Sequence, residues 1–336
     1  MREGYVRLVS TIALSALIAA WLTTHGPATS GVSASSAPWN PLSVVVPDVS
    51  LLTSPGDAGG SGSGSFVSAG AKQRASQVRD GPSYATSGSM PRQMWVWHPG
   101  NPKALVALAH RYGVTQLLVW VSPGFTANPT LVVRLTSLRL EAALSNIQVS
   151  ALCGDPSWAS NPQVAGQWAT EARNSGLFSR LHLDVEPHAR PDWVTRRLTL
   201  TRGLLATLRA AAASGLPVDA DIPYWYNAVS TSGGEPLDLA VMRLASSVTI
   251  MAYRNNAAAA LAAAAPELAH AQSAGKLAWL GLNTASTGAD PASTSFLGRS
   301  RADIQKDFST LDVWGQRWPS LAGLALHDSD SLAVLR

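Results

Sequence analysis

Two acidic side chains at the end of an apolar run are the strongest indication of a functional site in the sequence. Residues 181–186 read Leu-His-Leu-Asp-Val-Glu, and an extended chain places His182, Asp184 and Glu186 on one face. Charged residues are rarely buried unless they are paired. Closely spaced carboxylates move each other's pKa apart, which leaves one able to act as an acid near neutral pH. The spacing therefore predicts an acid/base site, a metal site, or a structural ion pair with Arg190 or Arg254.

Further polar and aromatic residues follow other apolar runs. Flat aromatic rings can stack on sugar rings, and Tyr or Trp adds a polar group. Trp95, Trp120 and Trp279 lie inside apolar runs, so we assign them to the core. Asn283 either positions a substrate or caps a local turn. The candidate substrate-binding residues are Trp97, His98, Asp155, Asp221, Tyr224, Trp225, Asn283 and His327, with Tyr253 beside the acids.

These residues need a scaffold that brings strand ends together. Short, continuous apolar runs are typical of parallel strands covered on both faces. Eight such runs are 93–97, 116–121, 148–152, 181–185, 217–222, 247–251, 277–282 and 321–326. Helix-like segments between them are 102–111, 131–145, 161–175, 193–214, 257–273 and 301–314.

This alternation predicts an α/β fold, a (β/α)8 TIM barrel, over residues 91–336. The alternative is a doubly wound open sheet, but no G-x-G-x-x-G segment follows the first strand; Trp97-His98-Pro99-Gly100 stands there instead. In a barrel the residues that follow each strand line the catalytic face. We therefore expect the candidate residues to share one end of the barrel.

Two short motifs resemble the chitinase-type family 18 glycoside hydrolases. They are Asp184-Val185-Glu186 after the fourth predicted strand and Met251-Ala252-Tyr253 after the sixth. The resemblance spans the predicted barrel and implies Glu186 as general acid/base, Asp184 as its supporting carboxylate and Tyr253 as a hydrogen-bonding partner of the sugar. It also implies that the N-acetyl oxygen of the substrate attacks the anomeric carbon, a known exception to the two-carboxylate scheme.

The chain departs from this pattern next to the acids. The family places further acids two and five residues before Asp184, where this sequence has His182 and Ser179. We expect a divergent relative rather than a chitinase: a glycoside hydrolase acting on a polysaccharide or glycan, plausibly N-acetylated. For a substrate without an N-acetyl group, Asp155 or Asp221 would have to supply the second carboxylate.

Two other functions fit the same residues. One is a carbohydrate-binding barrel without catalysis. The other is a metal-dependent hydrolase that uses His98, His188 or His327 with neighbouring acids. Because no H-E-x-x-H or comparable ligand spacing is present, we expect no metal and no cofactor.

Composition narrows the function classes. The 336 residues are 46% hydrophobic and 14% charged, with a formal net charge of +4. Lys and Arg form no cluster, so we expect no nucleic-acid partner. The single cysteine, Cys153, excludes an intramolecular disulfide and fits a buried thiol. We expect a monomer.

The first ninety residues indicate export. Residues 1–34 combine Arg2 and Arg7 with an apolar run and small residues, which is typical of a signal peptide or a membrane anchor. Residues 35–90 are rich in Ser, Gly and Pro and predict a disordered linker. We expect a secreted or cell-surface protein, with a possible membrane tether through the N-terminal segment.

Overall fold

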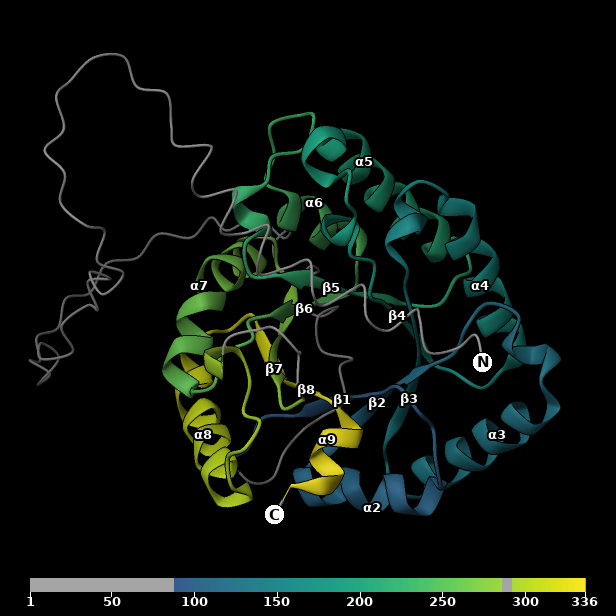
Figure 1. The fold of residues 1–336 in the computed structure, drawn as a ribbon, viewed down its shortest axis with the longest axis vertical. Coiled ribbons are helices and arrows are strands. Elements are labelled where there is room, and N and C mark those ends of the chain that lie inside the picture. Colours follow the sequence, from purple (N-terminus) through teal and green to yellow (C-terminus); the bar gives the residue numbers. More distant parts are fainter. Residues whose placement is uncertain (1–87, 286–291, 336) are drawn as a thin grey trace, which may run out of the picture. The chain divides into compact units, whose positions relative to one another are not determined.

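The computed structural model describes residues 88–285 and 292–335. The predicted export segment and nearly all of the predicted linker lie outside these residues. The described chain forms a closed barrel of eight parallel strands in sequence order, seen end-on in Figure 1. The strands are β1 (Arg92–Val96), β2 (Val114–Trp120), β3 (Gln148–Cys153), β4 (Arg180–Leu183), β5 (Val218–Pro223), β6 (Ser247–Met251), β7 (Leu277–Asn283) and β8 (Leu321–His327).

Helices surround the barrel (Figure 1). They are α2 (Pro102–Tyr112), α3 (Pro129–Leu144), α4 (Pro162–Ser175), α5 (Trp193–Ala212), α6 (Leu237–Leu244), α7 (Ala257–Ser273), α8 (Arg301–Trp314) and α9 (Ser329–Val334). The predicted (β/α)8 barrel is confirmed, and the doubly wound sheet is wrong because β1 pairs with β8 and closes the sheet. In the described chain, no helix has both the length and the apolar character needed to cross a membrane.

Local signals in the sequence set the helix boundaries. The side chains of Asn101, Asn128 and Asn256 accept hydrogen bonds from the first turns of α2, α3 and α7 at 2.9–3.1 Å. Such caps satisfy backbone N–H groups that have no partner within the helix. Gly113 ends α2 with φ of 66°, a left-handed conformation that glycine adopts without a steric penalty.

Alternation along the strands separates two apolar cores. Leu181 and Leu183 of β4 face outward into the large core beneath the helices. Trp95 of β1 and Leu152 of β3 face inward and belong to a small core inside the barrel. His182, between these two leucines, and Asp184, directly after them, therefore face the interior, as the alternation predicted.

Polar side chains also cross the barrel interior. Gln93 Nε2 of β1 donates to Thr249 Oγ1 of β6 at 2.7 Å, and Trp95 Nε1 donates to Asp221 Oδ2 of β5 at 3.3 Å. These strands are not neighbours in the sheet. TIM-barrel interiors are usually filled by branched apolar residues, so these hydrogen bonds mark an unusually polar interior under the carboxyl-terminal ends of the strands.

Candidate active site

Asp184 and Glu186 follow β4 at the carboxyl-terminal mouth of the barrel, where the strands end. Asp184 N donates to Cys153 O at 3.0 Å, which extends the pairing with β3 by one residue. Glycine is required opposite, because a Cβ on Gly154 would overlap the backbone carbonyl of Asp184. This close approach fixes the backbone of Asp184. Both acidic side chains are half-buried.

In the described part of the chain, neither Asp184 nor Glu186 pairs with an arginine or a lysine. Arg190 pairs with Asp192 at 2.9 Å, and Arg254 donates to the carbonyl of Tyr253 and stacks over Tyr224 at 4.5 Å. Among the described residues, Asp184 Oδ1 is buried without a hydrogen-bond partner. The alternative of a salt bridge to Arg190 or Arg254 is therefore wrong.

Burial and like charges raise the pKa of both acids. Burial, and then the charge of Asp221, raises the pKa of Asp184 to about 7, while His182 opposes the shift. Burial raises the pKa of Glu186 well above its ordinary value, and the carboxylates of Asp184 and Asp221 add to this. The raised pKa of Glu186 favours its protonated form, which is the state a general acid needs.

A buried ion pair lies directly beneath the acids. His182 Nε2 lies 2.8 Å from Asp221 Oδ1, and neither side chain is exposed. Burial disfavours the charged imidazole, but the charge and hydrogen bond of Asp221 outweigh it and raise the pKa of His182. Trp95 holds the second oxygen of Asp221. The sequence analysis predicted Asp221 as a substrate contact; the structure places its carboxylate below the mouth with both oxygens engaged.

Tyr253 completes the group around the acids. Its phenol is half-buried, and burial, followed by the charges of Asp221, Asp184 and Glu186, raises its pKa well above 10. The hydroxyl therefore stays protonated and can donate to a ligand. The prediction that Asp184, Glu186 and Tyr253 share one end of the barrel agrees with this placement.

Aromatic and amide groups form another wall of the mouth, from β1, β7 and β8. Trp97 Nε1 donates to His327 Nε2 at 3.1 Å, and His327 Nδ1 lies 3.1 Å from Asn283 Oδ1. Because Nε2 accepts, Nδ1 carries the hydrogen, and burial lowers the pKa of His327. Asn283 Nδ2 is buried without a partner among the described residues. Trp120 stacks against Trp97, with ring centroids 5.5 Å apart.

Four other predicted substrate-binding residues contact groups outside this wall. His98 is exposed and pairs with Asp330 at 2.6 Å. Asp155 caps the short helix η2 (Pro156–Ala159) through the backbone N of Ser157. Tyr224 lies under Arg254. Trp225 is half-buried against His188.

The sequence analysis did not predict the contacts that three residues make at or below the mouth. Trp95 and Trp120 were assigned to the core, yet Trp95 holds Asp221 and Trp120 stacks on Trp97. His188 was considered only as a metal ligand, but it lies beside Glu186, with Nε2 3.8 Å from Oε1. Trp120 is the last residue of β2, and this position at a strand end could have predicted that it lies at the mouth.

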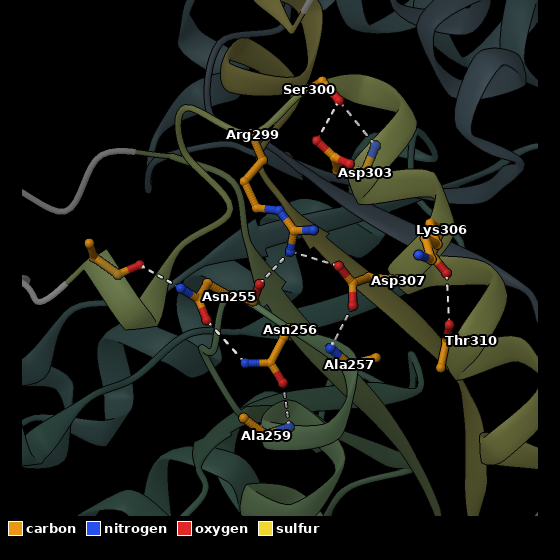
Figure 2. Close-up of polar contacts among 11 residues, drawn as sticks. Asn255, Asn256, Ala257, Ala259, Arg299, Ser300, Asp303, Lys306, Asp307 and Thr310 are labelled. Carbon is orange, nitrogen blue, oxygen red and sulfur yellow. Dashed lines mark hydrogen bonds and ion pairs between the residues drawn. The ribbon is translucent and has the colours of Figure 1, made fainter.

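A polar network anchors the chain that follows Tyr253 (Figure 2). Arg299 Nη1 donates to the carbonyl of Asn255 at 2.6 Å and to Asp307 Oδ2 at 2.7 Å. The other oxygen of Asp307 accepts from Ala257 N at 2.9 Å. The network thus ties the β6–α7 loop to Arg299, just before α8, and to Asp307 in the middle of α8.

Two further expectations concern reactive or metal-binding groups. Cys153 is buried, as predicted, and burial raises the pKa of its thiol. A buried thiol of this kind is a poor nucleophile. In residues 88–285 and 292–335, no three His, Cys, Asp or Glu side chains form a group that could hold a metal ion.

Comparison with known proteins gives only distant similarities. No family profile matches the chain, and no curated protein does. A Cycas revoluta class V chitinase, solved as a mutant in complex with (GlcNAc)3, is 13% identical and covers 71% of this chain and 95% of its own, with a TM-score of 0.43. A chitinase from Chromobacterium violaceum is 14% identical, with coverage of 73% and 96% and a TM-score of 0.43. A GH5-4 endoglucanase from an uncultured bacterium is 10% identical, with coverage of 71% and 82% and a TM-score of 0.46.

Proposed function

We propose that this chain is an exported glycoside hydrolase that cleaves a polysaccharide or glycan containing an N-acetylated sugar. One observation carries the proposal: Glu186 is half-buried at the barrel mouth, and no Arg or Lys of the described residues pairs with it, so that burial and the nearby carboxylates raise its pKa. Asp184 and Tyr253 lie close enough to influence one another electrostatically. A proton donor, a second acid and a phenol are the groups that glycosidic bond cleavage uses.

The proposed reaction has two steps. Glu186 gives its proton to the glycosidic oxygen as the bond to the anomeric carbon breaks, and the acetamido oxygen of the substrate bonds to that carbon. Asp184 accepts a hydrogen bond from the acetamido N–H, and Tyr253 donates to the sugar. Glu186 then takes a proton from water, whose oxygen displaces the acetamido oxygen. Two displacements return the anomeric carbon to its original configuration.

The aromatic wall supports a sugar ligand. Trp97 is half-buried and in contact with Trp120 and His327, so its ring is held at the mouth rather than free to rotate. Indole rings offer flat apolar faces of the kind that stack on sugars. Asn283 Nδ2, which has no hydrogen-bond partner among the residues that the structure describes, provides a donor for a sugar hydroxyl or carbonyl oxygen.

The direct test compares Glu186→Gln with Glu141→Gln. Glu141 is on the outer helix α3, so its substitution makes the same chemical change away from the mouth. We expect Glu186→Gln to lower hydrolysis of N-acetylglucosamine oligomers by about 10²–10⁴-fold while binding persists. Glu141→Gln should leave hydrolysis unchanged. Binding without hydrolysis in the unsubstituted protein would instead identify a non-catalytic carbohydrate-binding barrel.

The substrate class needs its own measurement. We expect hydrolysis of N-acetylated oligosaccharides in preference to glucose oligomers of equal length, because only the former carry the acetamido nucleophile. Product NMR should show retained configuration at the first turnover. Inverted products would require a second carboxylate in place of the acetamido group. Activity that EDTA abolishes would support the metal-dependent alternative.

Export is the remaining part of the proposal. It rests on residues 1–34, whose basic start and apolar run fit a signal peptide or an anchor. In bacterial fractionation we expect the full chain outside the cytoplasm and a chain without residues 1–34 inside it. Recovery in the membrane fraction would indicate an uncleaved anchor, and full-length protein in the cytosol would contradict export.

A further inference from the structure

His188 is held in an aromatic enclosure beside Glu186. It belongs to the short helix η3 (Pro187–Ala189) and is buried. The rings of Trp225, Tyr226 and Trp193 meet its ring nearly edge-on, with centroids 5.2, 5.7 and 6.3 Å away. Three flanking rings leave the imidazole little freedom to rotate. Its two nitrogens therefore have fixed directions.

The hydrogen bonds around the ring select one tautomer. Tyr226 Oη lies 3.0 Å from His188 Nδ1. Burial, together with the charges of Glu186 and Asp184, raises the pKa of Tyr226 well above 10, so the hydroxyl keeps its hydrogen. If that hydrogen is donated to Nδ1, the imidazole hydrogen is on Nε2. The reverse assignment would leave the Tyr226 hydrogen without an acceptor among the hydrogen bonds of the described residues.

The second nitrogen faces the proposed proton donor. His188 Nε2 lies 3.8 Å from Glu186 Oε1 and is buried without a hydrogen-bond partner among the described residues. At 3.8 Å the contact is longer than a hydrogen bond. A small movement of the Glu186 side chain, which is 19% exposed, would close it.

We propose that His188 is a positioning residue for Glu186, with Tyr226 donating to Nδ1 and Nε2–H thereby directed at the Glu186 carboxyl group. When Glu186 gives up its proton, the new carboxylate accepts a hydrogen bond from Nε2–H. His188 supplies this hydrogen bond as a neutral ring and keeps both its protons. The proposal rests on the proposed function for the role of Glu186.

The charges around Glu186 explain why such a donor is needed. Asp184 on its own segment and Asp221 of β5 both disfavour a carboxylate at Glu186. Tyr253 after β6 and Tyr226 after β5 also face it, as neutral phenols. His182, whose charge opposes the raised pKa of Asp184, is already paired with Asp221. A neutral donor stabilises the carboxylate form without holding Glu186 ionised beforehand. His188 suits this role, because burial lowers its pKa to about 3.

The first experiment needs no enzymatic activity. Protein labelled with ¹⁵N in its histidines is studied by long-range proton–nitrogen NMR, and the His188 signals are assigned by their loss in His188→Gln. We expect a neutral ring with hydrogen on Nε2 and none on Nδ1 between pH 5 and 8. Hydrogen on Nδ1, or a charged ring in that range, would overturn the proposal.

The second experiment measures the pKa of Glu186 by carbon NMR in four proteins. His188→Leu removes the donor, and we expect the proton affinity of Glu186 to rise roughly tenfold. His188→Gln restores an amide donor and should remain within roughly threefold of the unsubstituted protein. His110→Leu, on the exposed side of α2, is the matched control and should change nothing.

Tyr226→Phe separates positioning from packing, because it keeps the ring and removes only the hydroxyl. We expect hydrogen to distribute over both nitrogens of His188 and kcat to fall more than KM rises. An unchanged tautomer and unchanged Glu186 pKa in a folded Tyr226→Phe protein would overturn the proposal. If the protein hydrolyses no glycan, the proposed function fails. The tautomer of His188 and the pKa of Glu186 would still show whether His188 directs Nε2–H at Glu186.

Discussion

β4 and β5 carry acidic groups at both ends of the barrel interior, and the two ends treat them differently. At the amino-terminal end, Asp219 accepts two hydrogen bonds from Arg180 and one from Ser247, all at 2.7 Å. At the carboxyl-terminal mouth, one oxygen of Asp184 has no hydrogen-bond partner within residues 88–285 and 292–335, and the ion-pair contact of Glu186 in this part of the chain is with His188 at 3.8 Å.

On this pair of strands, the acid at the amino-terminal end serves stability, and the acids at the mouth are available for chemistry. A buried carboxylate with all its partners present is held firmly in its charged form. A buried carboxyl group without them retains its proton and can exchange it with a substrate. His182 and Asp221 lie between the two ends and are paired with each other. Of the acids that β4, β5 and the residues directly after them carry in the described chain, only Asp184 and Glu186 at the mouth lack such a partner.

Removing the compensated acid should have the largest effect on stability. Asp219→Ala leaves Arg180 and Ser247 without their shared partner, and we expect a loss of about 4 kcal/mol in the free energy of unfolding. Urea denaturation measures it. Asp330→Ala, at an exposed pair with His98, is the control and should cost less than about 1 kcal/mol. Equal costs would show that the buried contacts of Asp219 stabilise the fold no more than an exposed ion pair does.

The second-largest effect on stability is expected from a change in the backbone under the mouth. Gly154→Ala inserts a methyl group into the carbonyl of Asp184, and overpacking of this kind costs about 3 kcal/mol. We expect lower stability together with reduced hydrolysis, because Asp184 must move. Gly100→Ala has open space around it and should change neither. A Gly154→Ala protein with normal activity would show that the position of Asp184 is not critical.

Neutralising the uncompensated acid should stabilise the protein at high pH. The unfolded chain releases the Asp184 proton near its ordinary pKa of 3.8, and the folded chain holds it to about 7. The ionised side chain therefore lowers the stability of the folded state progressively as the pH rises from about 4 to 7. Relative to the unsubstituted protein, Asp184→Asn should gain about 2 kcal/mol at pH 8 and little at pH 4. This is about half of the roughly 4 kcal/mol that the full shift corresponds to, because the side chain is partly exposed to solvent.

The measurement is urea denaturation of both proteins at the two pH values. Using the difference between them removes contributions from other titrating groups, such as Glu267, whose pKa burial raises to about 8. A gain of equal size at pH 4 and pH 8 would contradict a raised pKa at Asp184. Hydrolysis should be lost in Asp184→Asn although the protein is more stable.

The smallest effect is expected in the network of Figure 2. Asp307→Ala removes the partner of Arg299 and a cap on Ala257, at a cost of about 1 kcal/mol because the pair is partly exposed. We expect a raised KM and little change in kcat, since the network anchors the loop after Tyr253 without touching the acids. Lys306→Ala, on the same helix, should leave KM unchanged.

The barrel was predictable because its strands are short apolar runs separated by helix signals. All eight predicted strands and six predicted helices are present with small differences at their ends. α6 and α9 were missed because they have only 8 and 6 residues, too few for a clear periodic pattern. The strand periodicity also predicted that His182, Asp184 and Glu186 lie in one row.

The partners of these residues could not be predicted from the sequence. Trp95 and Asp221 are 126 positions apart, and no local pattern links an indole of β1 to a carboxylate of β5 across the barrel. Likewise, Tyr226 and His188 meet only because the turns after β4 and β5 are adjacent. Alternation gives the direction of a side chain, but closure of the sheet determines what it contacts.

The single backbone hydrogen bond from Asp184 to Cys153 beyond the end of β4 has a consequence for heating. Terminal pairings of a sheet open with less free energy than its middle. Warming should therefore disengage the two acids while the eight strands remain joined. Enzymatic turnover would then decline at temperatures where circular dichroism still reports an intact barrel, and cooling would restore it.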